Sequence, residues 1–151
     1  MPGAQGRSPL VIRRVLAGLT VLVAVVASLV VGSAGPAAAF GGETFGCRVA
    51  PGTDFEWRSF CVNTRPATTY NAGFAVLNTS GGGYTYQWNV SGDYLYVIVG
   101  CHTYAHDCAV AVRGGSIDSE VNVSVTYTQN GQSATQHATA YIRGYCGSEL
   151  C

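Results

Sequence analysis

The sequence predicts an all-β protein, an antiparallel β-sandwich of about seven or eight strands that is stapled by disulfides and preceded by a signal peptide. Three observations lead to this fold class. From Tyr70 onward apolar and polar side chains alternate with a period of two, and no stretch has the period of a helix. Clusters of glycine, asparagine and serine interrupt the alternation at short spacing, as turns between strands do. Six cysteines follow an apolar leader, which is typical of a small exported domain.

The first residues of the chain have the order of a secretory signal peptide, residues 1–39. Arginines come first, an apolar run covers residues 15–31, and small residues fill positions 36–39. This pattern predicts cleavage between Ala39 and Phe40 and release of the remaining chain from the cell. Two alternatives stay open. The apolar run has about the minimum length for a transmembrane anchor, and the two adjacent arginines before it would fit a twin-arginine signal.

The part after the predicted cleavage site, residues 40–151, is long enough for one domain with a modest core. It keeps five arginines and all eight acidic residues, so its formal net charge is −3, and it contains no lysine. A basic surface for phosphate groups is therefore missing, which argues against electrostatic binding of DNA or RNA. Once the leader is removed, we expect no membrane contact.

All six cysteines lie in this domain, and an even number behind an export leader indicates three disulfides because the exported compartment is oxidising. The sequence alone does not choose among the possible pairings. The cysteines do form three local couples, so we expect Cys47–Cys61, Cys101–Cys108 and Cys146–Cys151. On this interpretation the domain divides into an N-terminal disulfide hairpin over residues 40–66, a sandwich core over 67–143 and a disulfide tail over 144–151.

The first elements of the domain are predicted as a hairpin and a strand. Pro51-Gly52 would form the turn of the hairpin that Cys47–Cys61 closes. Phe74 and Val76 mark the next strand, which is followed by turn-forming residues at 78–80.

Three strands follow in the middle of the chain. Residues 84–90 alternate between large and polar side chains, which predicts a strand whose Trp88 is turned inward, with the two sheets stacked around it. Residues 94–99 are apolar at every position, a pattern that suits a strand covered on both faces. Residues 108–112 continue the alternation until Gly114-Gly115 interrupts it.

The final hairpin has the strongest local signal. Large apolar and polar residues alternate over 121–128, and Asn130-Gly131 is a preferred two-residue turn of type I′ because both residues tolerate a positive φ. Large side chains on one strand then meet small ones on the other, which favours packing across the strands. The expected register pairs Gln129 with Gln132, Tyr127 with Ala134 and Val123 with Ala138, while Val125 opposite Gln136 is the one poor match.

Tyr86-x-Trp88 and the hairpin over residues 118–142 resemble an immunoglobulin-like sandwich of the bacterial PKD-like kind, over residues 67–143. In that resemblance Trp88 is the buried tryptophan of the core strand, and the valines at 121, 123 and 125 belong to the penultimate strand. Gly100-Cys101…Cys108 and Cys146-Gly147…Cys151 are similar to stretches of uncharacterised exported proteins of actinomycetes. The cysteines are not placed for an antibody-type bridge between the sheets. The resemblance implies a scaffold and no specific activity.

The segment Cys101-His102-x-x-x-His106-Asp107-Cys108 is the one dense cluster of potential metal ligands. Zinc prefers such donors, but cysteines of an exported protein more often oxidise, so we expect a disulfide-closed polar loop rather than a metal site. No Gly-x-Ser-x-Gly, His-Glu-x-x-His or phosphate-binding glycine motif is present, and the strand pattern brings no nucleophile to a base. We therefore expect no catalytic residue, cofactor, metal or enzymatic activity.

Aromatic side chains in excess of one inner layer supply the candidate binding surface: Tyr94, Tyr96, Tyr104 and Trp57. The first functional expectation is a secreted, non-catalytic extracellular module that recognises a protein or the cell envelope, or acts structurally. The alternative is a carbohydrate-binding module that stacks sugar rings on these aromatics. A further alternative is a secreted protease inhibitor that presents the loop from Cys101 to Cys108, with Tyr104 as its exposed anchor.

Overall fold

The structure is a computed structural model that describes residues 40–52 and 56–151, so the predicted signal peptide lies outside the described residues. The described residues form strands and no helix, and none of them belongs to an apolar helix that could cross a membrane. The strands are β1 (Thr44–Ala50), β2 (Phe60–Val62), β3 (Thr69–Leu77), β4 (Thr85–Gly92), β5 (Tyr96–Gly100), β6 (Asp107–Arg113), β7 (Ser119–Gln129), β8 (Gln132–Ile142), β9 (Tyr145–Cys146) and β10 (Glu149–Leu150).

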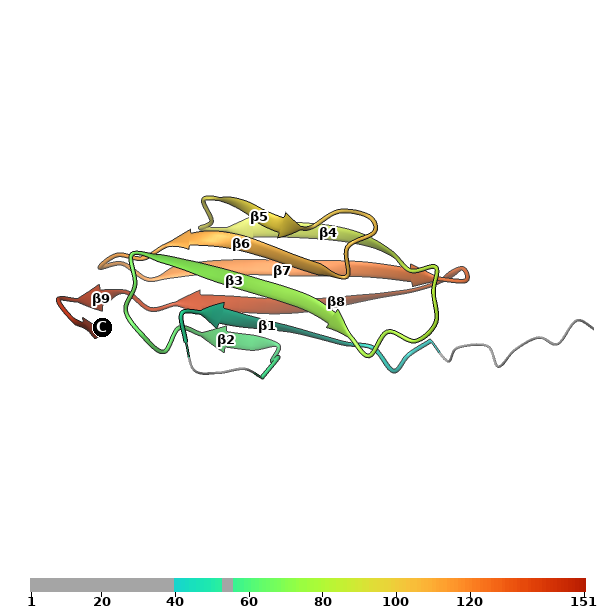
Figure 1. Ribbon diagram of the computed structural model, residues 1–151, viewed down its shortest axis with the longest axis horizontal. Coiled ribbons are helices and arrows are strands. Elements are labelled where there is room, and N and C mark those ends of the chain that lie inside the picture. Colours follow the sequence, from blue (N-terminus) through green and yellow to red (C-terminus); the bar gives the residue numbers. More distant parts are fainter. Residues whose placement is uncertain (1–39, 53–55) are drawn as a thin grey trace, which may run out of the picture. The chain divides into compact units, whose positions relative to one another are not determined.

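Eight of these strands make two four-stranded sheets that lie against each other, as Figure 1 shows. One sheet has the order β1-β3-β6-β5 and the other has the order β2-β8-β7-β4. β9 and β10 form a separate two-stranded hairpin, which holds the disulfide Cys146–Cys151. The all-β sandwich and the number of strands in it are therefore confirmed, but it is not wholly antiparallel as predicted, because β2 pairs with β8 in parallel. The tail hairpin adds two short strands that the sequence did not signal.

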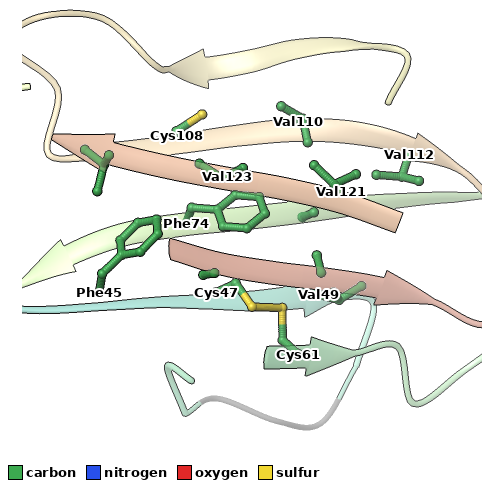
Figure 2. Close-up of a cluster of buried hydrophobic side chains, with 14 of the residues drawn as sticks. Phe45, Cys47, Val49, Cys61, Phe74, Cys108, Val110, Val112, Val121 and Val123 are labelled. Atoms are coloured by element: carbon green, nitrogen blue, oxygen red, sulfur yellow. A yellow bond between two sulfur atoms is a disulfide. The ribbon is translucent and has the colours of Figure 1, made fainter. Parts of the chain in front are cut away.

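The inner faces of the two sheets share one hydrophobic core, part of which is drawn in Figure 2. Strand side chains alternate between the two faces of a sheet, so every second residue of a strand reaches this core. In β3, β6 and β7 these residues are almost completely buried: Tyr70, Ala72, Phe74, Val76, Cys108, Val110, Val112, Val121, Val123, Val125 and Tyr127.

The hairpin of β7 and β8 has the register that the sequence predicts, from Gln129 opposite Gln132 onward. Asn130 and Gly131 have φ values of 51° and 79°, as a type I′ turn requires. The poor match at Gln136 is resolved by hydrogen bonds. Its Nε2 donates to the Tyr127 hydroxyl at 2.8 Å and to a main-chain carbonyl of the loop before β1 at 3.1 Å.

All three predicted disulfide pairs are confirmed, and the N-terminal segment folds back on itself where Arg58 pairs with Cys47, but its described residues form no regular two-stranded hairpin. β1 pairs with β3, whereas β2 pairs with β8 of the other sheet, in parallel. The bridge Cys47–Cys61 therefore joins the two sheets, as Figure 2 shows, although the spacing of the cysteines suggested no such link. Cys47 is completely buried, and the bridge links β1, the edge strand of one sheet, to β2, the edge strand of the other.

Trp88 does not lie at the centre of the core, where the sequence placed it. β4 is an edge strand, so the indole is only partly buried and packs against the border of the core. Its Nε1 donates to the carbonyl of Ala105 at 2.9 Å, in the loop between β5 and β6. The sheets stack around Phe74 and the valines of β6 and β7 rather than around Trp88, which instead closes one side of the sandwich.

Candidate functional site

The most unusual surface of the described domain is the apolar run at β5. Residues 94–99, which we call the β5 ridge, contain no charged side chain and are all exposed. Soluble proteins rarely leave contiguous apolar residues open to water unless something binds them. The exposed fractions are 37% for Tyr94, 46% for Leu95, 60% for Tyr96, 45% for Val97, 43% for Ile98 and 56% for Val99.

This exposure contradicts the prediction that residues 94–99 form a strand covered on both faces. Coverage on both faces requires a third layer, as helices supply over parallel sheets. The described chain has two layers of strands, so each strand has one face that no second sheet can cover. β5 is also the edge strand of its sheet. Its side chains on the face toward the core are therefore exposed to solvent as well.

Pairing with β6 shows which way the ridge side chains point. Tyr96 lies opposite Ala111 and Val97 lies opposite Val110. Directly opposed residues share a face of the sheet, so Val97 is on the core side with Val110 and Tyr96 is on the outer side. A β-bulge then places one extra residue, Ile98, between Val97 and Val99. The ridge therefore presents apolar side chains on both faces and at the edge.

The other three edge strands are β1, β2 and β4. Each of them either pairs with a further stretch of main chain or is very short. The main chain of Arg58 pairs with Cys47 of β1, with N···O distances of 2.7 and 3.3 Å. β4 donates from the Tyr86 N–H to the carbonyl of Thr103 at 2.8 Å, and β2 has only three residues. Among the residues described, β5 pairs through its main chain with β6 alone. Its other side therefore presents free N–H and C=O groups to a further strand.

The loop between β5 and β6 is a second exposed feature, and it is held rigidly. The disulfide Cys101–Cys108 closes it, and the bonds from Trp88 and Tyr86 tie its main chain to β4. Tyr104 is 80% exposed at the tip of this loop, whereas the neighbouring Ala105 is buried. A rigid loop with one projecting aromatic side chain can enter a pocket of another protein at little cost in conformational entropy.

The four aromatic residues predicted as a binding surface lie in different places. Tyr94 and Tyr96 belong to the start of the β5 ridge, and Tyr104 lies beyond its other end. Trp57 is next to β1, at the opposite edge of the same sheet. There the guanidinium carbon of Arg48 lies 4.6 Å from the centre of the indole ring. The four side chains thus do not make one continuous stacking platform for a sugar chain.

A shallow hollow of about 450 Å³ separates the loop from the outer face of β4 and β7. Its lining contains no Asp, Glu, Lys or Arg, and His102 is its one imidazole side chain. His102 Nδ1 accepts the N–H of Tyr104 at 3.3 Å. Acid–base catalysis needs a partner that orients or opposes such a base, and no carboxylate lines the hollow. The lining residues are Thr85, Tyr86, Gln87, Trp88, Cys101, His102, Thr103, Thr126 and Thr128.

A buried carboxylate lies at the end of the sandwich where the described chain begins. Glu43 is only 6% exposed. Its Oε2 accepts the N–H of Gly41 at 2.8 Å, and its Oε1 accepts the hydroxyl of Tyr84. The Tyr84 hydrogen bond holds the pKa of Glu43 below its usual value. Burial, together with the same hydrogen bond, raises the pKa of Tyr84.

Comparisons of the chain with protein-family models, with curated proteins and with solved structures gave no match.

Tyr94 and Tyr96 were predicted as part of a binding surface, whereas the aliphatic residues beside them were not: Leu95, Val97, Ile98 and Val99. The signal was present in the same run. An antiparallel sandwich without helices cannot cover a strand on both faces, so an apolar residue at every position already indicates exposure.

Proposed function

We propose that this protein is a secreted, non-catalytic module that binds an extracellular protein by pairing a strand of that partner with β5. The observation that carries the proposal is the β5 ridge, an unpaired sheet edge with six consecutive exposed apolar residues. In strand addition, main-chain hydrogen bonds supply affinity and the alternating side chains supply specificity. Natural edge strands usually carry charges or proline that prevent such pairing, and residues 94–99 carry neither.

Three disulfides support export from the cell, because such bonds persist in oxidising compartments. The leader over residues 1–39 would direct this export and be removed before Phe40. The absence of lysine and the net charge of −3 in the remaining chain favour a protein partner over a nucleic acid.

The strand order supports an immunoglobulin-like assignment for the scaffold. Constant-type immunoglobulin domains have strands A, B, E and D in one sheet and C, F and G in the other. By their order in the sheets, β1, β3, β6 and β5 would correspond to strands A, B, E and D, and β4, β7 and β8 to strands C, F and G. Trp88 on β4 would then occupy the place of the tryptophan on strand C, and β5 would be the exposed edge strand D.

A charge placed on the β5 edge tests the proposed binding mode. Val97→Lys puts an ammonium group at the edge without removing a fully buried side chain, and Gln132→Lys puts the same charge on the exposed start of β8 as a control. The immobilised wild type and both variants are incubated with the extracellular fluid of the producing cells. Proteins retained by the wild type and Gln132→Lys but not by Val97→Lys are then purified and titrated.

We expect Val97→Lys to weaken binding of the purified partner at least about tenfold, since a lysine opposes strand pairing and burial. We also expect the NMR signals of residues 94–100 to shift most on binding. Equal binding by Val97→Lys and Gln132→Lys would contradict the proposal. Sedimentation of the free wild type at increasing concentration shows whether the added strand comes from a second copy of this chain, which would remove the need for a foreign partner.

The rigid loop from Cys101 to Cys108 favours a second candidate, a protease inhibitor. Tyr104 is the most exposed aromatic side chain of this loop and would fill the specificity pocket of a chymotrypsin-type enzyme. Inhibition that disappears in Tyr104→Ala but not in Tyr96→Ala would support it. Full activity of chymotrypsin- and subtilisin-type proteases in a large excess of the protein would refute it.

A further inference from the structure

Glu43 is a buried carboxylate without a positively charged partner. Its two oxygens accept hydrogen bonds from Gly41 and Tyr84. No arginine or histidine side chain of the described residues lies within ion-pair distance of it, since the two ion pairs found there are Arg58–Glu56 and His106–Asp107. A buried ion lacking a counter-charge is unfavourable. The charge of Glu43 is stabilised by these two hydrogen bonds, with no cation of the described residues beside it.

The carboxylate also has room for another donor. Each carboxylate oxygen can accept two hydrogen bonds, and each oxygen of Glu43 receives one from a described residue. Tyr84 donates to the ionised form, and this hydrogen bond lowers the pKa of Glu43. A group that brings both a positive charge and free N–H donors would complete the site.

The main-chain nitrogen of Phe40 is next to this carboxylate. Gly41 N lies 2.8 Å from Glu43 Oε2, and successive backbone nitrogens are at most about 3.7 Å apart. The nitrogen of Phe40 is therefore no farther than about 6.5 Å from that oxygen, and opposite charges within about 4–6 Å shift each other's pKa. The Phe40 ring fixes this end of the chain, since it packs on the core with its centre 5.6 Å from that of Tyr127.

We propose that Glu43 is a binding site for the α-ammonium group that leader removal creates at Phe40. The proposal rests on the proposed export and on cleavage between Ala39 and Phe40. Before cleavage the Phe40 nitrogen is a neutral peptide N–H with one donor. After cleavage it is a cation with three donors, and it pairs with Glu43. Removal of the leader therefore stabilises the folded domain by supplying a positive charge beside Glu43.

The composition of the chain allows a selective test. The domain contains no lysine, so the α-amine of the chain that starts at Phe40 is its only primary amine. An acetylating reagent near neutral pH, followed by hydroxylamine to restore the tyrosines, neutralises this one group. The thermal midpoint is measured with and without acetylation for the wild type, for Glu43→Gln and for Glu149→Gln, which removes an exposed carboxylate from the tail as a matched control.

We expect acetylation to lower the midpoint of the wild type and of Glu149→Gln by about 3–6 °C and to leave that of Glu43→Gln unchanged. The α-amine gains a partner on folding, so its pKa rises above the unfolded value of about 7.7. The difference between free and acetylated chains should therefore be complete below about pH 7.7 and disappear as the pH rises through the folded value.

Two outcomes would overturn the proposal in different ways. An unchanged midpoint after acetylation, or an equal fall in Glu43→Gln, would show that Glu43 does not bind the amine. A secreted chain whose measured mass places its first residue elsewhere than Phe40 would instead refute the cleavage step. Neither result depends on binding at β5, so the two proposals fail separately.

Discussion

Replacing both Cys47 and Cys61 by alanine removes the covalent link between the two sheets. The bridge has a sequence separation of 14, and the chain-entropy relation gives about 3 kcal/mol for a loop of about 15 residues. Both cysteines are buried. Losing two buried sulfur atoms, each comparable to a methylene group, adds about 1 kcal/mol or slightly more. We therefore expect the free energy of unfolding to fall by about 4 kcal/mol and the thermal midpoint by about 15 °C.

The tail bridge provides the matched control. Cys146 and Cys151 are exposed and only 5 positions apart, so the same relation gives about 2 kcal/mol at most, without a burial contribution. Urea unfolding at pH 7, followed by tryptophan fluorescence and by circular dichroism, gives both values. The intact masses confirm that the remaining four cysteines are paired.

Equal losses of stability in the two double variants would refute the argument, because it predicts a difference of about 2 kcal/mol from loop length and burial. An unchanged midpoint in Cys47→Ala/Cys61→Ala would show that the core alone holds the two sheets together.

Three further perturbations test other parts of the structure. Val110 of β6 lies opposite Val97 of β5, but Val110 is 0% exposed and Val97 is 45% exposed. Urea unfolding should therefore show that Val110→Ala lowers the free energy of unfolding by about 2 kcal/mol, and that Val97→Ala lowers it by under about 0.5 kcal/mol. Gly100 has a φ of 73°, and an added Cβ would lie 2.0 Å from a carbonyl oxygen of β6, so Gly100→Ala should cost about 2 kcal/mol or more; a smaller loss would contradict this geometry. Hydrogen bonds from a main-chain N–H and from Tyr141 lower the pKa of Asp118. The ionised Asp118 therefore stabilises the fold above the unfolded pKa, and this stabilisation is lost as the pH falls through the folded pKa. Asp118→Asn should accordingly reduce the loss of stability at acid pH, measured as the free energy of unfolding against pH. An unchanged acid part of that profile would contradict this role of Asp118.

Several features of this domain followed directly from local sequence. The β7–β8 hairpin needed only Asn130-Gly131 and a regular alternation, because a two-residue turn determines the register of both strands. The disulfide pairs followed from proximity along the chain. The strand containing Phe74 was also correct, since its apolar residues alternate and turn residues follow it.

The binding role of the candidate aromatic residues stays a prediction, and the structure shows where they lie. Tyr96 and Tyr104 are exposed as expected, but Trp57 lies at the other edge of the sheet and Trp88 at the border of the core. An alternating pattern shows that one face of a strand is more apolar than its other face. It does not show whether a strand is central or at an edge, because strand order depends on contacts between distant segments.

The sequence by itself determined the main strands of the sandwich, the turn between β7 and β8 and the cysteine couples, since each depends on residues close together in the chain. Only the tertiary structure decided that Cys47–Cys61 joins two sheets, that β5 is an open edge and that Glu43 lies buried beside Phe40. The physical reason is the same in all three cases. Burial and pairing depend on which distant segment becomes a neighbour, and that choice is made by packing the whole core rather than by any local preference.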